Sequence, residues 1–172
     1  KPENKNLIVN RLEGRLAGNY LTKSNLAALD IIANNNWERP VYFVATNHTD
    51  EIGLSDYLQL DGLAYRLVPI STRTNSNFER GRIDTDIMYN NLMNKFRYGR
   101  MNEKDVYLDN FHLRTLSVIR LRFRFMRLAN QLAAEADRER AEEVLDRIME
   151  LTPHENIPYY VFIPGIAESY YQ

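Results

Sequence analysis

The sequence predicts a small α/β module over residues 1–100, with helices around a partly parallel sheet, followed by an α-helical, tetratricopeptide-like hairpin over residues 101–172 that packs against it. Three observations predict this fold class. Two short apolar runs bounded by turn-forming residues, at 40–45 and 63–70, are typical of buried strands. Apolar residues at helical spacing dominate residues 111–151, which predicts long paired helices.

A helix is expected directly before the first strand. Apolar residues recur at helical spacing within 22–34, where Thr22 or Ser24 provides the N-cap. Residues 34–36 are three asparagines, which accept the left-handed backbone conformation of a helix C-cap. Pro40 then begins the strand, at a position where the missing backbone N–H of proline costs no hydrogen bond of the sheet. The helix is apolar on nearly all sides, so we expect it to be covered on more than one of them.

The connection between the two strands spans residues 46–62. It begins as a polar loop at 46–53 and continues as two helical turns at 54–61. Parallel strands require a long crossover, so this length predicts that the two strands are parallel. A polar loop at 71–82 and a helix at 84–99 complete the first module.

The helical module contains one match to a tetratricopeptide repeat. Helices are predicted at 111–136 and 138–151, and the second is plainly amphipathic. A small residue is needed where two helix backbones approach closely, and the repeat pattern has Ala129 and Ala141 at these positions. The alternative is an ordinary helical hairpin, which differs little in fold. The residues that match the repeat are Phe125, Leu128, Ala129, Leu132, Ala141, Leu145, Ile148 and Pro153, and Ile166, Ala167 and Tyr170 begin a second unit.

Composition excludes several classes of protein. Lys+Arg is 22 and Asp+Glu is 23, so the chain lacks the basic surplus typical of general nucleic-acid binders. It contains no cysteine, which excludes a disulfide framework and a thiolate nucleophile. Its apolar runs are far shorter than the roughly 20 residues that span a bilayer. We therefore expect an excised soluble piece that is not itself membrane-spanning.

One candidate ligand site is the loop after the first predicted strand, which carries Asn47, His48, Asp50 and Glu51. Ligands often bind beyond the carboxyl ends of strands in open α/β sheets. These residue types can bind a ligand or transfer protons. The alternative is a solvated loop in which Asn and Asp form turns.

A second candidate is a basic stripe on the first long helix, formed by Arg120, Arg124 and Arg127, with Arg114 and Arg122 near it. Such a stripe can meet lipid headgroups or a phosphate-bearing ligand. The alternative is a solvated face whose charges pair with neighbouring carboxylates. His112 and His154 have no second histidine or cysteine at helical spacing, and no known metal or catalytic motif is present. We therefore expect no metal, no cofactor and no catalytic residue.

Five long phrases resemble the C-terminal soluble part of a bacterial multi-spanning membrane protein family that was long catalogued as a domain of unknown function. That family is similar to GT-C glycosyltransferases, including protein O-mannosyltransferases. The phrases are residues 21–26, 34–43, 57–70, 84–93 and 149–155.

The resemblance implies an extracytoplasmic, periplasm-facing accessory domain at the inner membrane. Its implied partners are the transmembrane part of the same parent chain and a protein or glycan acceptor. In that class the catalytic acids lie in loops of the membrane part, so none is carried over to this chain. We therefore expect a non-catalytic domain of a glycosyltransferase-like parent. The alternatives are a free-standing helical-repeat scaffold that binds a peptide or protein, and a small α/β enzyme that uses the His48 loop.

Overall fold

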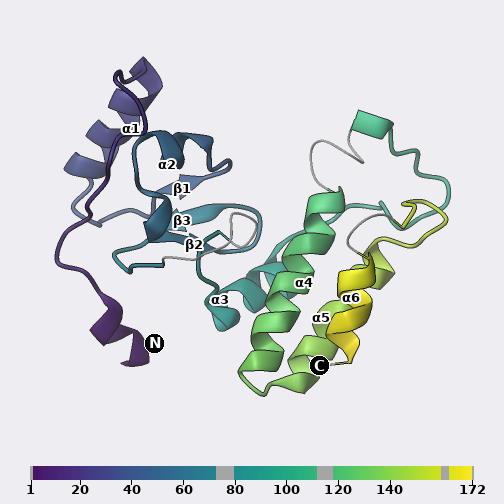
Figure 1. The fold of residues 1–172 in the computed structure, drawn as a ribbon. Helices are drawn as coiled ribbons and strands as arrows, with labels where there is room; N and C mark the ends of the chain where they lie inside the picture. Colours follow the sequence, from purple (N-terminus) through teal and green to yellow (C-terminus); the bar gives the residue numbers. More distant parts are fainter. Residues whose placement is uncertain (1, 73–79, 112–117, 160–162, 172) are drawn as a thin grey trace. The chain divides into compact units, whose positions relative to one another are not determined.

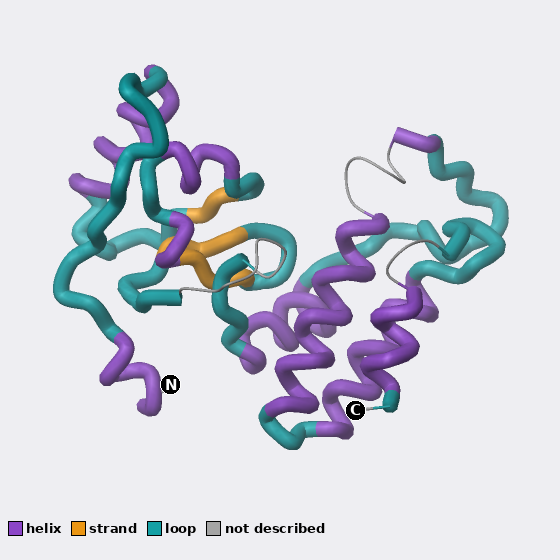
Figure 2. Tube along the Cα trace, viewed as in Figure 1, coloured by secondary structure: helices purple, strands orange, loops and turns teal. Residues whose placement is uncertain are grey.

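The computed structural model describes residues 2–72, 80–111, 118–159 and 163–171. The chain forms two compact units, Lys1–Asp84 and Thr85–Gln172 (Figure 1). The division predicted from the sequence, at residue 100, lies later in the chain. All strands of the described part lie in the first unit (Figure 2).

The first unit combines short helices with a three-stranded sheet. Its α1 helix begins after Thr22, whose side chain accepts a hydrogen bond from the Asn25 backbone N–H, so the predicted helix and N-cap are confirmed. The strands lie in the order β1-β3-β2, and both pairings are antiparallel. The elements are η1 (Pro2–Leu7), α1 (Lys23–Asn34), β1 (Tyr42–Phe43), α2 (Asn47–Glu51), η2 (Ser55–Tyr57), β2 (Leu58–Leu60) and β3 (Tyr65–Leu67).

The predicted parallel sheet is wrong, because the connection between the two predicted strands contains a strand of its own. Residues 58–60, which were expected to be helical, form β2 and pair with β3 as a hairpin. Gly62 closes this hairpin with a φ of 113°, which favours glycine. The chain therefore reverses instead of crossing over, and β1 pairs with β3 from the other side.

The first predicted strand is also much less buried than expected. Of residues 40–45, only Tyr42–Phe43 form a strand, and this strand lies at the sheet edge. Val44 is 81% exposed. The core of the unit lies elsewhere, around Ile52, Leu54, Tyr57 and Leu67. Leu29 and Ile32 of α1 pack on this cluster from one side, while Leu26 and Ile31 of the same helix are exposed. Coverage of α1 on several sides is therefore not observed within this unit.

The second unit is helical. It contains α3 (Thr85–Tyr89), η3 (Asn90–Lys95), α4 (Val118–Ala134), α5 (Arg138–Leu151) and α6 (Ile163–Tyr170). The segment η3 is a π-helix, and the hydroxyl of Tyr98 donates to the Leu92 carbonyl within it, 2.7 Å away. This bond satisfies a carbonyl of the widened helix. Burial raises the pKa of Tyr98 to about 12, so the hydroxyl remains a donor near neutral pH.

Helices α4 and α5 lie side by side in this unit (Figure 1). Asp137 caps α5 by accepting from the Arg140 backbone N–H. The two alanines of the repeat pattern, Ala129 and Ala141, are both buried. The predicted helix pair is thus present, whereas its assignment as a tetratricopeptide repeat stays a prediction. Within the described ranges, no helix combines the length and apolarity needed to cross a membrane.

Candidate binding site around Trp37

The chain leaves α1 through a tight turn that presents Trp37. The backbone N–H of Glu38 donates to the Asn35 carbonyl at 2.9 Å, which closes a four-residue turn. Both central residues have positive φ, 46° for Asn36 and 61° for Trp37. The Asn35 side-chain amide donates to the Arg39 carbonyl at 2.7 Å and ties the exit of the turn to its entry. Asparagine suits such a turn, but tryptophan does not.

Trp37 is therefore held in a conformation that its side chain disfavours. A left-handed backbone costs a residue with a Cβ roughly 1–2 kcal/mol, and bulky residues rarely adopt it. Burial does not compensate fully, because Trp37 remains 52% exposed. A disfavoured backbone that holds an apolar ring at the surface is a feature from which a binding role can be inferred.

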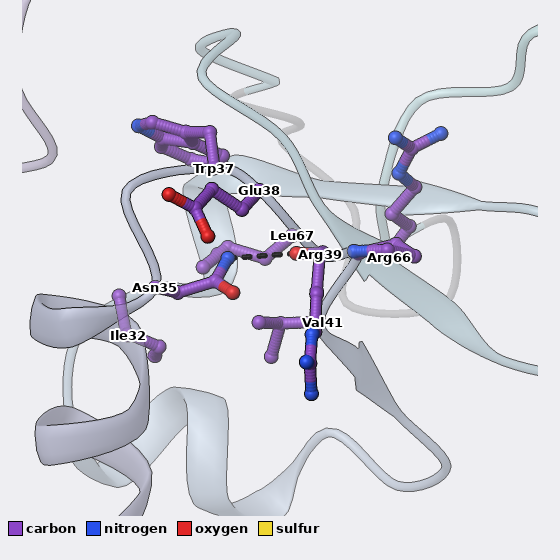
Figure 3. Close-up of a pocket in the computed structure, with 9 residues that line it drawn as sticks. Ile32, Asn35, Trp37, Glu38, Arg39, Val41, Arg66 and Leu67 are labelled. Atoms are coloured by element: carbon purple, nitrogen blue, oxygen red, sulfur yellow. Dashed lines mark hydrogen bonds between the residues drawn. The ribbon is translucent and has the colours of Figure 1, made fainter.

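A first pocket lies on one side of the turn. It has a volume of about 130 Å³ and is lined by Ile32, Asn35, Trp37, Glu38, Arg39, Pro40, Val41, Arg66 and Leu67. In Figure 3 the Trp37 ring and Glu38 lie on one side, above Asn35, and the Arg39 side chain runs beside Val41 on the other. The Arg66 side chain extends away from Arg39. The pocket thus combines apolar side chains with one carboxylate and two guanidinium groups.

A second pocket shares Ile32 and Trp37 with the first. Its volume is about 250 Å³, and it is lined by Val9, Asn10, Arg11, Leu12, Ile32, Ala33, Asn36, Trp37 and Pro69. Trp37 therefore borders two shallow pockets at once. We call the two pockets and this ring the Trp37 surface.

The charges of the Trp37 surface are unevenly paired. Arg11 forms an ion pair with Glu13 at 2.5 Å. For Arg39 and Arg66, the described part of the chain provides no carboxylate within ion-pair distance. Glu38 is the one carboxylate among the residues that line either pocket. The surface therefore carries a local positive surplus, although the whole chain is close to neutral.

The sequence profile of a known family, described as TMEM260-associated domain 2, matches residues 1–87. This match covers half of the chain. The chain belongs to the TMEM260-associated domain 2 family. TMEM260 is a membrane protein, so the predicted link to a membrane protein family holds, while a glycosyltransferase link is not shown. The family match includes Trp37 and every residue that lines its two pockets. No curated protein and no solved structure matches the chain.

The predicted loop site of this TMEM260-associated domain is helical. Asn47, His48, Asp50 and Glu51 lie in α2, and Asn47 is exposed. The side chain of His48 lies outside what the structure describes. Glu51 accepts a hydrogen bond from the buried Asn25 side chain at 2.8 Å, which fastens α2 to α1. Ligand binding by these residues stays a prediction.

Asp50 is engaged with groups of its own unit. Its carboxylate accepts hydrogen bonds from Arg80 and from the Ser55 hydroxyl. Partial burial raises the pKa of Asp50, but the bonds from Arg80 and Ser55 lower it more, so the net pKa lies below the usual range. In the described structure Asp50 therefore holds α2, η2 and the segment at residue 80 together.

The predicted basic stripe is not uniform in exposure. Arg120 is exposed, Arg124 is half-buried and Arg127 is 8% exposed. These three residues, which lie beyond the part of the chain matched by the family profile, therefore do not form one open basic face. A phosphate or lipid role for them stays a prediction.

A fourth arginine of α4, Arg122, was predicted to lie near the basic stripe but is buried instead. Arg114, the other arginine predicted near the stripe, lies outside the described residues. Arg122 is 1% exposed, the most buried of the charged residues that the structure describes. Its guanidinium donates to Thr152 Oγ1 at 3.0 Å and to the carbonyls of Thr152, Ile157 and Pro158 at 2.7–2.9 Å. Burial lowers its pKa, while nearby Tyr159 raises it. A sequence signal existed, because Arg122 is three residues before Phe125 and seven before Ala129, on the buried helix face.

Arg122 stabilises the end of α5 without a carboxylate. The Thr152 carbonyl lies at the C-terminus of that helix, where the macrodipole places partial negative charge. Every acceptor of Arg122 that the structure describes is a neutral oxygen. This arrangement is structural, and it does not form a site for a ligand. Within the described residues, no group of three His, Cys, Asp or Glu side chains is arranged to bind a metal ion.

Proposed function

We propose that this chain is a non-catalytic accessory domain of a TMEM260-type membrane protein, and that it binds a partner or acceptor at the Trp37 surface. The observation that carries the proposal is Trp37 itself, half exposed on a left-handed backbone between two pockets. A residue kept for stability alone would be buried, or would be glycine at this φ.

The proposal extends to the parent protein. We propose that the parent is a glycosyltransferase of the GT-C type, and that this domain lies at the extracytoplasmic face of its membrane. The phrases at 34–43 and 57–70 support this, because they contribute to the resemblance and also contain residues that line the first pocket. The transmembrane part of the same parent would then perform the chemistry, while this domain positions the acceptor.

The deciding variant is Trp37→Gly in the full-length parent. Glycine relieves the left-handed strain, so the stability of the 172-residue chain should change by less than about 1 kcal/mol, against roughly 3–5 kcal/mol for truncating a core tryptophan. The variant should reach the membrane at normal abundance but fail to correct the defect of cells that lack the parent. Val44→Ala, at a more exposed position that lines neither pocket, is the matched control and should correct it. Full correction by Trp37→Gly would refute the proposal.

A second candidate is the helical scaffold that binds a peptide. A hollow of about 290 Å³ favours it, lined by Ala133, Arg138, Ala141, Glu142, Leu145, Ser169, Tyr170 and Tyr171. Peptides selected for binding to the chain should then lose affinity with Tyr171→Ala and keep it with Tyr107→Ala, an equally exposed tyrosine elsewhere in this unit. Equal affinity for both variants would eliminate this candidate.

A further inference from the structure

The two pockets of the Trp37 surface are each small, and both are lined by Ile32 and Trp37. Sites for drug-sized molecules usually enclose about 300–1,000 Å³. The pockets here measure about 130 and 250 Å³, so neither alone suits a compact ligand of that kind. Two small apolar pockets that share Trp37 suit an extended chain, because residues i and i+2 point to one face about 7 Å apart.

The walls of both pockets are suited to apolar side chains. Val41 and Leu67 line the first, Leu12 and Pro69 line the second, and Ile32 contributes to both. A small apolar side chain in each pocket would leave the intervening peptide unit over Trp37. Tryptophan and arginine are the residues most enriched among those that dominate binding energy at protein interfaces.

The charged side chains around the first pocket indicate which residues should flank the apolar pair of such a segment. Arg39 and Arg66 extend in different directions from the first pocket and have no carboxylate partner among the described residues. Acidic residues on either side of the apolar pair would meet these guanidinium groups with favourable geometry. Arg11, already paired with Glu13, contributes less.

A glycan is less well matched to this surface. Sugar hydroxyls require free, convergent hydrogen-bonding groups. The Asn35 side-chain amide already donates to the Arg39 carbonyl. Arg39 and Arg66 diverge in Figure 3 instead of converging on one point.

Resting on the proposed role of the Trp37 surface, we propose that its occupant is an extended peptide segment with apolar residues at i and i+2 and acidic residues on both sides. Trp37 is the sole tryptophan of the chain, so selectively excited tryptophan fluorescence reports this surface alone. The probe is a capped synthetic peptide of about nine residues, roughly 30 Å when extended. It carries two leucines separated by one serine, with glutamates elsewhere.

Titration of the 172-residue chain with this peptide should shift the Trp37 emission to shorter wavelength as the indole leaves water. A matched peptide with lysines in place of glutamates should bind at least about tenfold more weakly, because like charges then meet. At about 1 M salt, where the Debye length is about 3 Å, the difference should shrink. Arg39→Ala should weaken binding of the glutamate peptide by up to about fivefold, as for an exposed ion pair, and Val44→Ala should not weaken it.

Several results would overturn the inference. Equal binding of the lysine peptide, or no emission change at millimolar glutamate peptide, excludes the acidic segment. An emission change with a neutral oligosaccharide but not with the peptide assigns the surface to a glycan. If Trp37→Gly still inactivates the parent, these results rule out the acidic peptide and leave the proposed function standing. If Trp37→Gly leaves the parent active, the proposed function fails as well.

Discussion

Arg122 and Trp37 occupy environments opposite to those their side chains usually prefer. Arginine is almost never fully buried unless it is paired, yet Arg122 lies in the core of the helical unit with neutral acceptors only. Tryptophan is highly buried on average, yet Trp37 is half exposed. Hydrogen bonds explain why Arg122 is buried, because each one satisfies a carbonyl or hydroxyl near the end of α5. No contact described within the first unit explains why Trp37 is exposed, and we therefore assign a binding role to it.

Truncation of Arg122 should be among the most damaging single changes in the helical unit. Arg122→Ala removes all four hydrogen bonds and leaves buried acceptors unsatisfied, so we expect a loss of roughly 3–5 kcal/mol in the free energy of unfolding. Urea denaturation followed by circular dichroism measures this loss. The exposed Arg120 of the same helix is the control, and Arg120→Ala should stay within about 0.5 kcal/mol. Similar losses for both variants would show that Arg122 is not the buried anchor.

The ionised Asp50 carboxylate makes the stability of the first unit depend on pH in the acid range. Its folded pKa lies below the unfolded value of about 3.9, so its ionised form contributes stability above that pH. This contribution is lost as pH falls through the lower folded pKa. The stability difference between wild type and Asp50→Asn should be constant above about pH 5 and should shrink below about pH 4. Because Asp50 is partly exposed, the difference should stay below about 1 kcal/mol.

Unfolding titrations of both proteins between pH 7 and 2, in steps of about one unit, measure this change. Arg80→Gln removes the main hydrogen-bond donor to Asp50 and should abolish most of the same pH dependence. A difference that does not vary with pH would show that the Asp50 carboxylate is not stabilised in the folded state.

At the scale of elements, sequence patterns predicted helices better than strands. Helix α1 and the α4–α5 pair were predicted because their apolar periodicity extends over several turns. The strands have only two or three residues each, so no alternation develops within them. Residues 58–60 are Leu-Gln-Leu, which fits a helix or a strand equally, and pairing with β3 decides the outcome.

The same limit applies to the candidate site. The three asparagines correctly predicted the end of α1 and a left-handed residue, because asparagine tolerates positive φ. That the left-handed conformation continues into Trp37 could not be predicted, since tryptophan has no such preference. The apolar run after Pro40 favoured a buried strand, and no sequence pattern singled out Trp37 as a surface residue. The position of β1 at the edge of the sheet, which the sequence alone does not show, is the reason that this strand is not buried.

The crossing of α4 and α5 depends on small residues. Ala129 is 1% exposed and belongs to α4, which packs against α5. Ala129→Leu adds volume to a close-packed contact and should cost roughly 1–3 kcal/mol. Thermal melts of this variant and of Ala167→Leu, an exposed alanine of α6, give the comparison. A smaller cost at position 129 than at 167 would show that the helices do not meet closely there.

For the whole molecule, the two compact units should respond separately to a local change. Each unit has a buried core of its own, which is the usual basis of independent cooperative unfolding. Trp37 fluorescence reports the first unit, whereas helical circular dichroism reports mostly α4 and α5. Arg122→Ala should therefore lower the midpoint of the circular dichroism transition and leave the fluorescence transition in place. Coincident transitions in the variant would indicate a single cooperative structure.

The position of the Arg122 acceptors also orders events during synthesis. They lie 30 to 36 residues further along the chain. At a ribosomal rate of about 5–20 residues per second, the arginine emerges roughly 2–7 s before them. During that interval α4 cannot bury its guanidinium without a large desolvation penalty. The nascent helical unit must therefore stay open until Pro158 has emerged from the ribosome.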